Sequence, residues 1–96
     1  MGVARPRKSP HDHGRSEIWE RPGLKRAIKA EREKLGRRLR QLREGKKLSQ
    51  QMAAEEMGVH AKHISRLETG VSNVTFGTLV AASVAYGVPL KALFDE

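Results

Sequence analysis

Lys62 and Arg66 are the residues of this chain whose type and spacing best suit a chemical task, the recognition of nucleic acid. They stand four apart in residues 61–68, a segment with helical periodicity. Residues four apart share one face of a helix, and Ile64 and Leu67 fall on the opposite face. Lysine and arginine can donate hydrogen bonds to O6 and N7 of guanine. The pattern therefore predicts a helix with one face in the core and the other open to a ligand.

Two short helices joined by a tight turn are expected to position these cations. Ser49 is a good N-cap for a helix over residues 50–57, and Gly58 supplies the left-handed residue that commonly ends a helix. The second helix then begins at Ala61 and stops before Gly70. This is a helix-turn-helix arrangement.

Short motifs at fixed offsets continue from Leu48 to the end of the chain. They are Leu48-Ser49-Gln50, Ala53-Ala54, Gly58-Val59, Ile64-Ser65, Glu68-Thr69-Gly70, Gly87-Val88-Pro89-Leu90 and Leu93-Phe94. In this register, the chain from about Lys34 onward resembles the Cro and phage-repressor class of helix-turn-helix proteins, also called the xenobiotic-response-element family. The resemblance implies an all-α, five-helix lambda-repressor-like DNA-binding domain.

The resemblance also implies which side chains meet DNA. Lys62, Arg66 and Ala61 match the positions that face base edges in the major groove, where the alanine methyl can pack on a thymine methyl. Gln50 matches a phosphate-contacting position at a helix N-terminus, which favours an anion. The full set of expected phosphate contacts is Ser49, Gln50, His60, His63, Ser72, Asn73 and Thr75. The alternatives are a solvated helix face for the two cations and a capping or solvated role for Gln50.

Two departures from the family pattern bear on this site. His60 stands at the N-cap of the second helix, where Ser or Thr is usual, so either some capping is lost or the imidazole reaches a phosphate. The loop over residues 70–74 has no cation, although relatives often place one there. The resemblance further implies a structural ion pair between Arg43 and Glu68, which would brace the recognition helix without touching DNA.

The remaining helices follow from periodicity and caps. Apolar residues predict a helix over residues 33–45, or one that starts as early as residue 23, with Gly36 as a kink or as the true start. Thr75 is a credible N-cap for a helix over residues 76–86, which Gly87 ends, and a short last helix opens at Pro89. The core face of the helix over 76–86 is expected to hold Phe76, Leu79, Ala82 and Tyr86.

That same helix carries Val80, Ala81 and Val84 away from its core face. A helix that is apolar nearly all round is usually buried on more than one side. The second covering could be another subunit or a folded-back Ile18-Trp19 segment, and a small exposed apolar strip is the third possibility. Candidate dimer-interface residues are Val80, Val84, Leu90 and Phe94.

Charge is distributed unevenly along the 96 residues, whose formal net charge is +8. Residues 1–47 hold 16 Lys and Arg against 6 Asp and Glu, whereas residues 48–96 hold 3 against 5. We therefore divide the chain into a basic N-terminal arm over 1–32, without structure of its own over 1–21, and a helix-turn-helix domain over 33–96. The basic arm is expected to add sequence-independent affinity for phosphates, although it could merely be solvated.

Composition excludes several other classes. There is no cysteine, no apolar run of membrane-spanning length and no apolar stretch of a signal peptide at the N-terminus. His11, Asp12, His13, His60 and His63 do not form a complete ligand set, so no metal and no cofactor is expected. No arrangement of nucleophile, base and oxyanion donor is visible, so an enzyme is not expected.

These observations favour a transcriptional regulator, a repressor that binds a palindromic operator on double-stranded DNA as a homodimer. It would act in the cytoplasm of a bacterium or on behalf of a phage, associated with the nucleoid. One alternative is the antitoxin of a toxin–antitoxin pair that represses its own operon and holds a toxin through the N-terminal arm. Another is a protein-binding adaptor that kept the fold without binding DNA.

Overall fold

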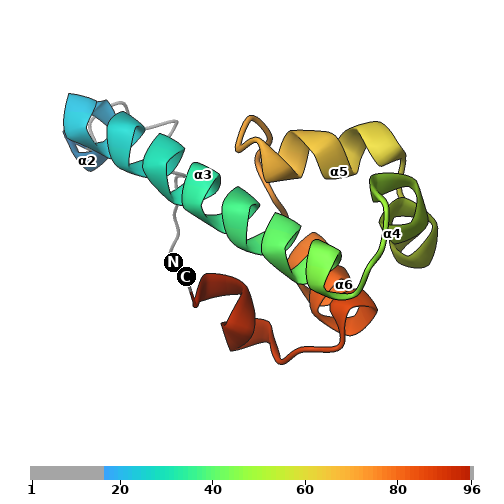
Figure 1. Cartoon of the computed structure of the whole chain (residues 1–96). Coiled ribbons are helices and arrows are strands. Elements are labelled where there is room, and N and C mark those ends of the chain that lie inside the picture. The colour runs from blue at the N-terminus through green and yellow to red at the C-terminus, as the bar shows by residue number, and fades with distance from the viewer. Residues whose placement is uncertain (1–16, 96) are drawn as a thin grey trace, which may run out of the picture.

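The computed structural model describes residues 17–95, and every regular element in that part of the chain is helical (Figure 1). The elements are α2 (Glu17–Glu20), α3 (Pro22–Gly45), α4 (Gln50–Met57), α5 (Ala61–Glu68), α6 (Phe76–Tyr86) and the 3-10 helix η2 (Leu90–Phe94). The prediction of an all-α fold is confirmed. No helix within residues 17–95 is both long and apolar enough to cross a membrane. His11, Asp12, His13 and the cations of residues 1–16 lie outside the described residues.

The long helix α3 runs without a break for 24 residues, from Pro22 in its first turn to Gly45. The shorter helix expected over 33–45 is therefore wrong, and the earlier start is right to within one residue. Gly36 neither begins nor interrupts α3. It lies where α3 crosses α5, and a Cβ atom there would stand 2.5 Å from the carbonyl oxygen of Glu68. A close helix crossing, not a kink, explains this glycine.

The short helix α2 lies within the segment that was expected to lack structure. Ile18 and Trp19 belong to this single exposed turn, which Figure 1 places at the end of α3 far from α6. Trp19 therefore does not cover Val84, whose side chain is 76% exposed. The hypothesis that the Ile18-Trp19 segment folds back onto α6 is not supported by this structure.

The core lies where α3, α4, α5, α6 and η2 converge. Its fully or nearly buried apolar side chains come from each of these helices: Leu39, Ala53, Ala54, Ile64, Leu67, Ala82, Tyr86 and Leu93. Burial raises the pKa of Tyr86 to about 12, and the nearby Glu68 carboxylate adds to the shift. The predicted inner face of α5 is thus the face that the structure buries.

The orientation of α6 differs from the prediction at one end. Ala82 and Tyr86 are buried and Leu79 is partly buried against the core, but Phe76 is 69% exposed. The placement of Phe76 on the core face is therefore wrong. Because Phe76, Val80 and Val84 are four residues apart, they form one exposed apolar stripe along α6.

Candidate nucleic-acid interface

The turn between α4 and α5 is built by local signals that the sequence carries. Ser49 caps α4, since its hydroxyl oxygen accepts a hydrogen bond from the Met52 backbone N–H at 3.0 Å. Gly58 ends α4 in the left-handed conformation with φ 71°. His60 occupies the N-cap of α5 but makes no side-chain capping hydrogen bond. Some capping is therefore lost at His60, as one of the two sequence alternatives anticipated.

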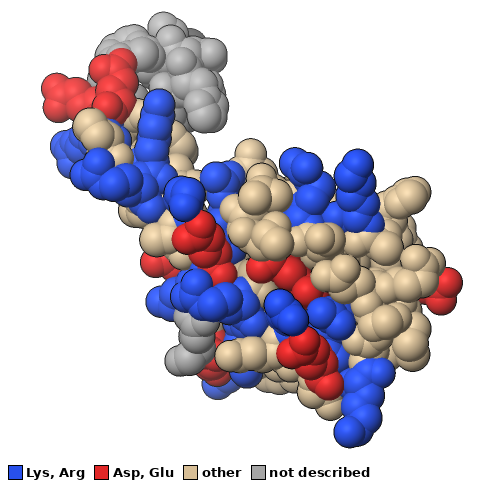
Figure 2. All heavy atoms as spheres, turned by 45° about the horizontal axis from the view of Figure 1, so that its top comes forward, with Lys and Arg blue, Asp and Glu red and all other residues tan. Residues whose placement is uncertain are grey.

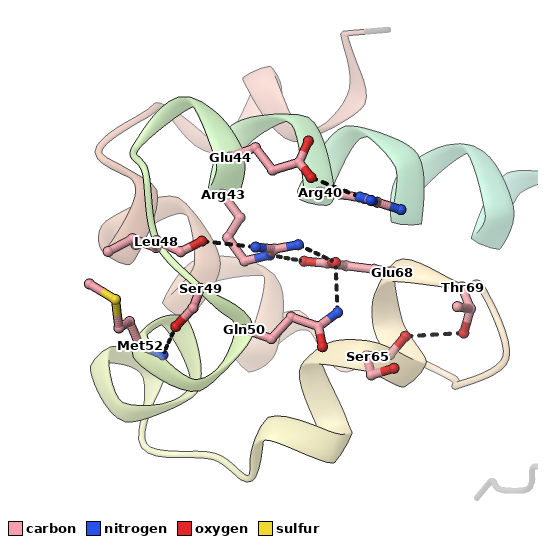
Figure 3. A network of polar contacts seen from close by, with 10 residues as sticks. All are labelled: Arg40, Arg43, Glu44, Leu48, Ser49, Gln50, Met52, Ser65, Glu68 and Thr69. Atoms are coloured by element: carbon pink, nitrogen blue, oxygen red, sulfur yellow. Dashed lines mark hydrogen bonds and ion pairs between the residues drawn. The ribbon is translucent and has the colours of Figure 1, made fainter.

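The inner side of α5 is fixed to α3 by a buried ion pair (Figure 3). The Arg43 guanidinium donates from Nε to Oε2 of Glu68 at 2.6 Å and from a terminal nitrogen to Oε1 at 3.0 Å. Another Arg43 nitrogen donates to the Leu48 carbonyl at 2.8 Å, which also anchors the entry to α4. The hydrogen bond to Glu68 raises the pKa of Arg43. The structure therefore contains the brace that the family resemblance implied.

Gln50 joins this brace. Its side-chain amide donates to Oε1 of Glu68 at 3.1 Å, and the side chain is partly buried (Figure 3). An amide has two N–H groups, so this bond leaves a second donor. Gln50 thus links the first turn of α4 to the end of α5, and its contact to phosphate stays a prediction.

The outer side of α5 carries the two cations of the sequence pattern. Lys62 and Arg66 are exposed, whereas Ala61 and His63 are half-buried and His60 is exposed. Nε of Arg66 donates to the Ser72 hydroxyl at 3.3 Å, so the guanidinium lies over the loop that follows α5. The structure brings these residues onto one helix, with cations outside and apolar residues inside.

The loop after α5 receives a cation from a distant part of the chain. Arg32 of α3 donates to Oδ1 of Asn73 at 2.6 Å. Thr75 then caps α6, since its hydroxyl accepts from the Thr78 backbone N–H at 3.1 Å. The sequence analysis did not single out Arg32, because a contact across 41 positions leaves no local pattern. Two cations from outside residues 70–74, Arg32 and Arg66, therefore donate hydrogen bonds to this loop.

Positive charge also gathers beyond the helix-turn-helix. Figure 2 shows Lys and Arg side chains along the projecting N-terminal end of α3 and again on the part of the domain that carries α5. Gly70 sits against Glu33, since a Cβ atom at Gly70 would lie 2.8 Å from the Cα atom of Glu33. Residues 22–33 of α3 therefore extend past the C-terminal end of α5.

The four dimer candidates lie on two different elements. Val80 and Val84 are exposed on α6, whereas Phe94 is 55% exposed on η2 and Leu90 is partly buried against the core. Their place in an interface between copies stays a prediction.

Comparison with known proteins bears on residues 34–96, which match the family model of a helix-turn-helix domain. Among solved structures, the chain is similar to the restriction-modification controller protein C.AhdI from Aeromonas hydrophila. The sequences are 32% identical, the TM-score is 0.66, and the similarity covers 68% of this chain and 98% of that one. No curated protein matches the chain.

Proposed function

Because the chain belongs to the helix-turn-helix family of DNA-binding regulators, we propose that it represses transcription by reading a palindromic operator as a homodimer. The observation that carries this proposal is the two-sided α5 helix. Its inner side is held by apolar packing and the Arg43–Glu68 pair, while Lys62 and Arg66 remain exposed. A rigid helix that presents two cations four residues apart suits guanine-containing base edges.

The surrounding polar groups suit the phosphates on either side of such a helix. Gln50 at the start of α4 and Thr75 at the start of α6 lie at helix N-termini, which attract anions. The Ser49 hydroxyl accepts a hydrogen bond as a cap, so its own O–H group can still donate to phosphate. The Thr75 hydroxyl, which caps α6, also shares a hydrogen bond with the Thr78 hydroxyl at 3.0 Å. Arg32, Ser72 and Asn73 add a cationic and polar loop beside them.

Selection of bound duplexes from a random DNA pool tests the proposal. A dimer with twofold symmetry should enrich an imperfect palindrome whose half-sites are about 10 base pairs apart, one turn of the duplex. Enrichment of a single half-site would contradict the dimeric reading. Recovery of unrelated sequences at every round would contradict sequence-specific binding altogether.

We propose that the chain controls transcription near its own gene, so that the selected palindrome recurs upstream of it. A reporter driven by that upstream region should lose activity when the chain is supplied. A rise in reporter activity would show activation in place of repression.

The basic N-terminal segment is proposed to add affinity that does not depend on sequence. Deletion of residues 1–21 removes five Lys and Arg: Arg5, Arg7, Lys8, Arg15 and Arg21. Affinity should fall equally for selected and random duplexes, and the slope of log affinity against log salt should flatten by about one unit per lost phosphate contact. A truncated chain that binds equally well at all salt concentrations would instead favour a protein partner for this segment.

A further inference from the structure

An apolar groove of about 480 Å³ lies between the N-terminal half of α3 and η2. Phe94, at its η2 side, is 55% exposed. The family match begins at residue 34, so the part of α3 over residues 22–33 that forms one wall precedes it. The groove is therefore partly built by a segment outside the helix-turn-helix domain. Its apolar lining consists of Leu24, Ala27, Ile28, Leu35, Val74, Leu93 and Phe94.

The α3 wall of this groove has the spacing of a surface that packs against another helix. Leu24, Ile28, Glu31 and Leu35 follow one another at intervals of four, three and four residues. Alternating spacings of three and four residues are typical of the a and d positions, which form the apolar seam between paired helices. Within residues 17–95, no helix covers this seam at residues 24 and 28, which lie in the projecting part of α3 (Figure 1).

We infer that a second copy of this chain covers the groove, with the N-terminal halves of the two α3 helices crossing antiparallel near Ile28. The inference rests on the homodimer of the proposed function and specifies its surface. Each α3 helix would cover the apolar seam of the other, as an isologous interface requires. The exposed stripe of Phe76, Val80 and Val84 on α6 would then lie outside the interface.

Charges along the seam fit such a crossing. Glu31 stands in the seam itself, where an unpaired carboxylate would be costly to bury. In an antiparallel crossing at Ile28, Glu31 of one copy lies level with Lys25 of the other, because both are three residues from the crossing. An occupant that covers Glu31 therefore has to supply a cation, and a second copy supplies Lys25.

The N-terminal segment of the same chain is a poorer occupant. Residues 1–16 contain Pro6 and Pro10, which oppose a helix long enough to fill a helical seam.

The position of the groove also suits a pair of DNA readers. Val74 lines the groove, and Arg32 on its wall bonds Asn73, so the groove adjoins the loop that follows α5. Two copies joined there place their α5 helices on either side of one twofold axis. A palindromic operator requires that arrangement.

An engineered disulfide tests the crossing directly, because the chain has no cysteine. Ile28→Cys should form a disulfide-linked dimer on mild oxidation, since a twofold axis at this residue brings the two Cβ atoms within disulfide reach. Val84→Cys, exposed on the α6 stripe, is the matched control and should cross-link at least about tenfold more slowly. Equal rates, or faster linkage through Val84→Cys, would overturn the inference.

Sedimentation of the full chain gives an independent readout. Ile28→Glu should raise the dimer dissociation constant by at least about 100-fold, because it buries a second carboxylate near Glu31. Val84→Glu should leave it unchanged. Far-UV circular dichroism controls for folding, and the conservative Ile28→Cys keeps the disulfide test valid if Ile28→Glu fails to fold. A wild-type monomer at tens of micromolar, or a dimeric Ile28→Glu, would contradict the proposal.

None of these measurements uses DNA, so their failure leaves base reading by α5 to be judged separately.

Discussion

The inner and outer faces of α5 carry charges that differ in burial and in their partners. On the inner face, Glu68 is buried and satisfied by Arg43 and Gln50. On the outer face, Lys62 and Arg66 are exposed, and the hydrogen bond that Arg66 donates to Ser72 is long at 3.3 Å. A buried charge that is already paired within the fold is not available to a ligand. An exposed cation can exchange one partner for another with little effect on the stability of the fold. The comparison separates the charges that fix α5 to the rest of the fold from those that remain available to a ligand.

Removal of the inner-face cation should have the largest effect on stability. Arg43→Met leaves the buried Glu68 carboxylate without its main partner and should lower the free energy of unfolding by about 3–5 kcal/mol. Denaturant unfolding measures this change. The double variant Arg43→Met with Glu68→Met should recover much of the loss, because two apolar side chains leave no charge unpaired. A double variant as unstable as the single one would mean that the pair is not the brace.

The close crossing of α3 and α5 gives the next largest effect. Gly36→Ala places a Cβ atom 2.5 Å from the Glu68 carbonyl oxygen, so the backbones must separate. We expect a loss of about 1–3 kcal/mol of unfolding free energy, as in other overpacked interiors. Gly23→Ala is the control, since nothing lies within 4 Å of a Cβ atom there. If both variants are equally stable, the inner face is looser than the structure shows.

The caps and glycines of this chain also show which features the sequence predicts and which it does not. The N-caps Ser49 and Thr75 and the left-handed Gly58 and Gly87 were predictable, because a cap depends on its immediate neighbours. The interpretation of Gly36 as a kink or as the true start of the helix is wrong, because the reason for this glycine lies on α5, more than thirty residues away in the chain.

The prediction for Phe76 failed for a similar reason, and the contact of Arg32 with the loop was not foreseen. The periodicity of α6 could not orient Phe76, since the helix is apolar nearly all round and only packing decides which residues are buried. Arg32 of α3 donates a hydrogen bond to Asn73 in the loop that follows α5, and no local motif in the sequence predicts that contact. The residues expected to bind DNA were identified from their register in the family motif, so their distances and partners had to come from the structure.

Helix capping should give smaller and opposite changes at the two ends of the turn. Ser49→Ala removes a hydroxyl that caps α4 and should cost about 1 kcal/mol of unfolding free energy. His60→Ser should stabilise the chain by up to about 1 kcal/mol, because the His60 side chain makes no capping hydrogen bond. Thermal unfolding of the two variants beside wild type measures both changes. A destabilised His60→Ser would indicate that the imidazole has a structural role at this position.

Substitution of the outer-face cations should affect stability least and DNA selectivity most. Lys62→Ala and Arg66→Ala should leave the free energy of unfolding within about 0.5 kcal/mol of wild type, because both side chains are exposed. Each should lose roughly 1–3 kcal/mol of discrimination between the selected operator and a scrambled duplex of equal length. Lys91→Ala, an exposed cation on η2, is the control for charge alone.

Competition between operator and scrambled duplexes, measured on these folded variants, is therefore the most direct test of whether the outer face of α5 reads DNA sequence. We expect selectivity to fall in Lys62→Ala and Arg66→Ala and to persist in Lys91→Ala. Unchanged selectivity in both α5 variants would contradict this expectation and remove this helix as the reader of DNA.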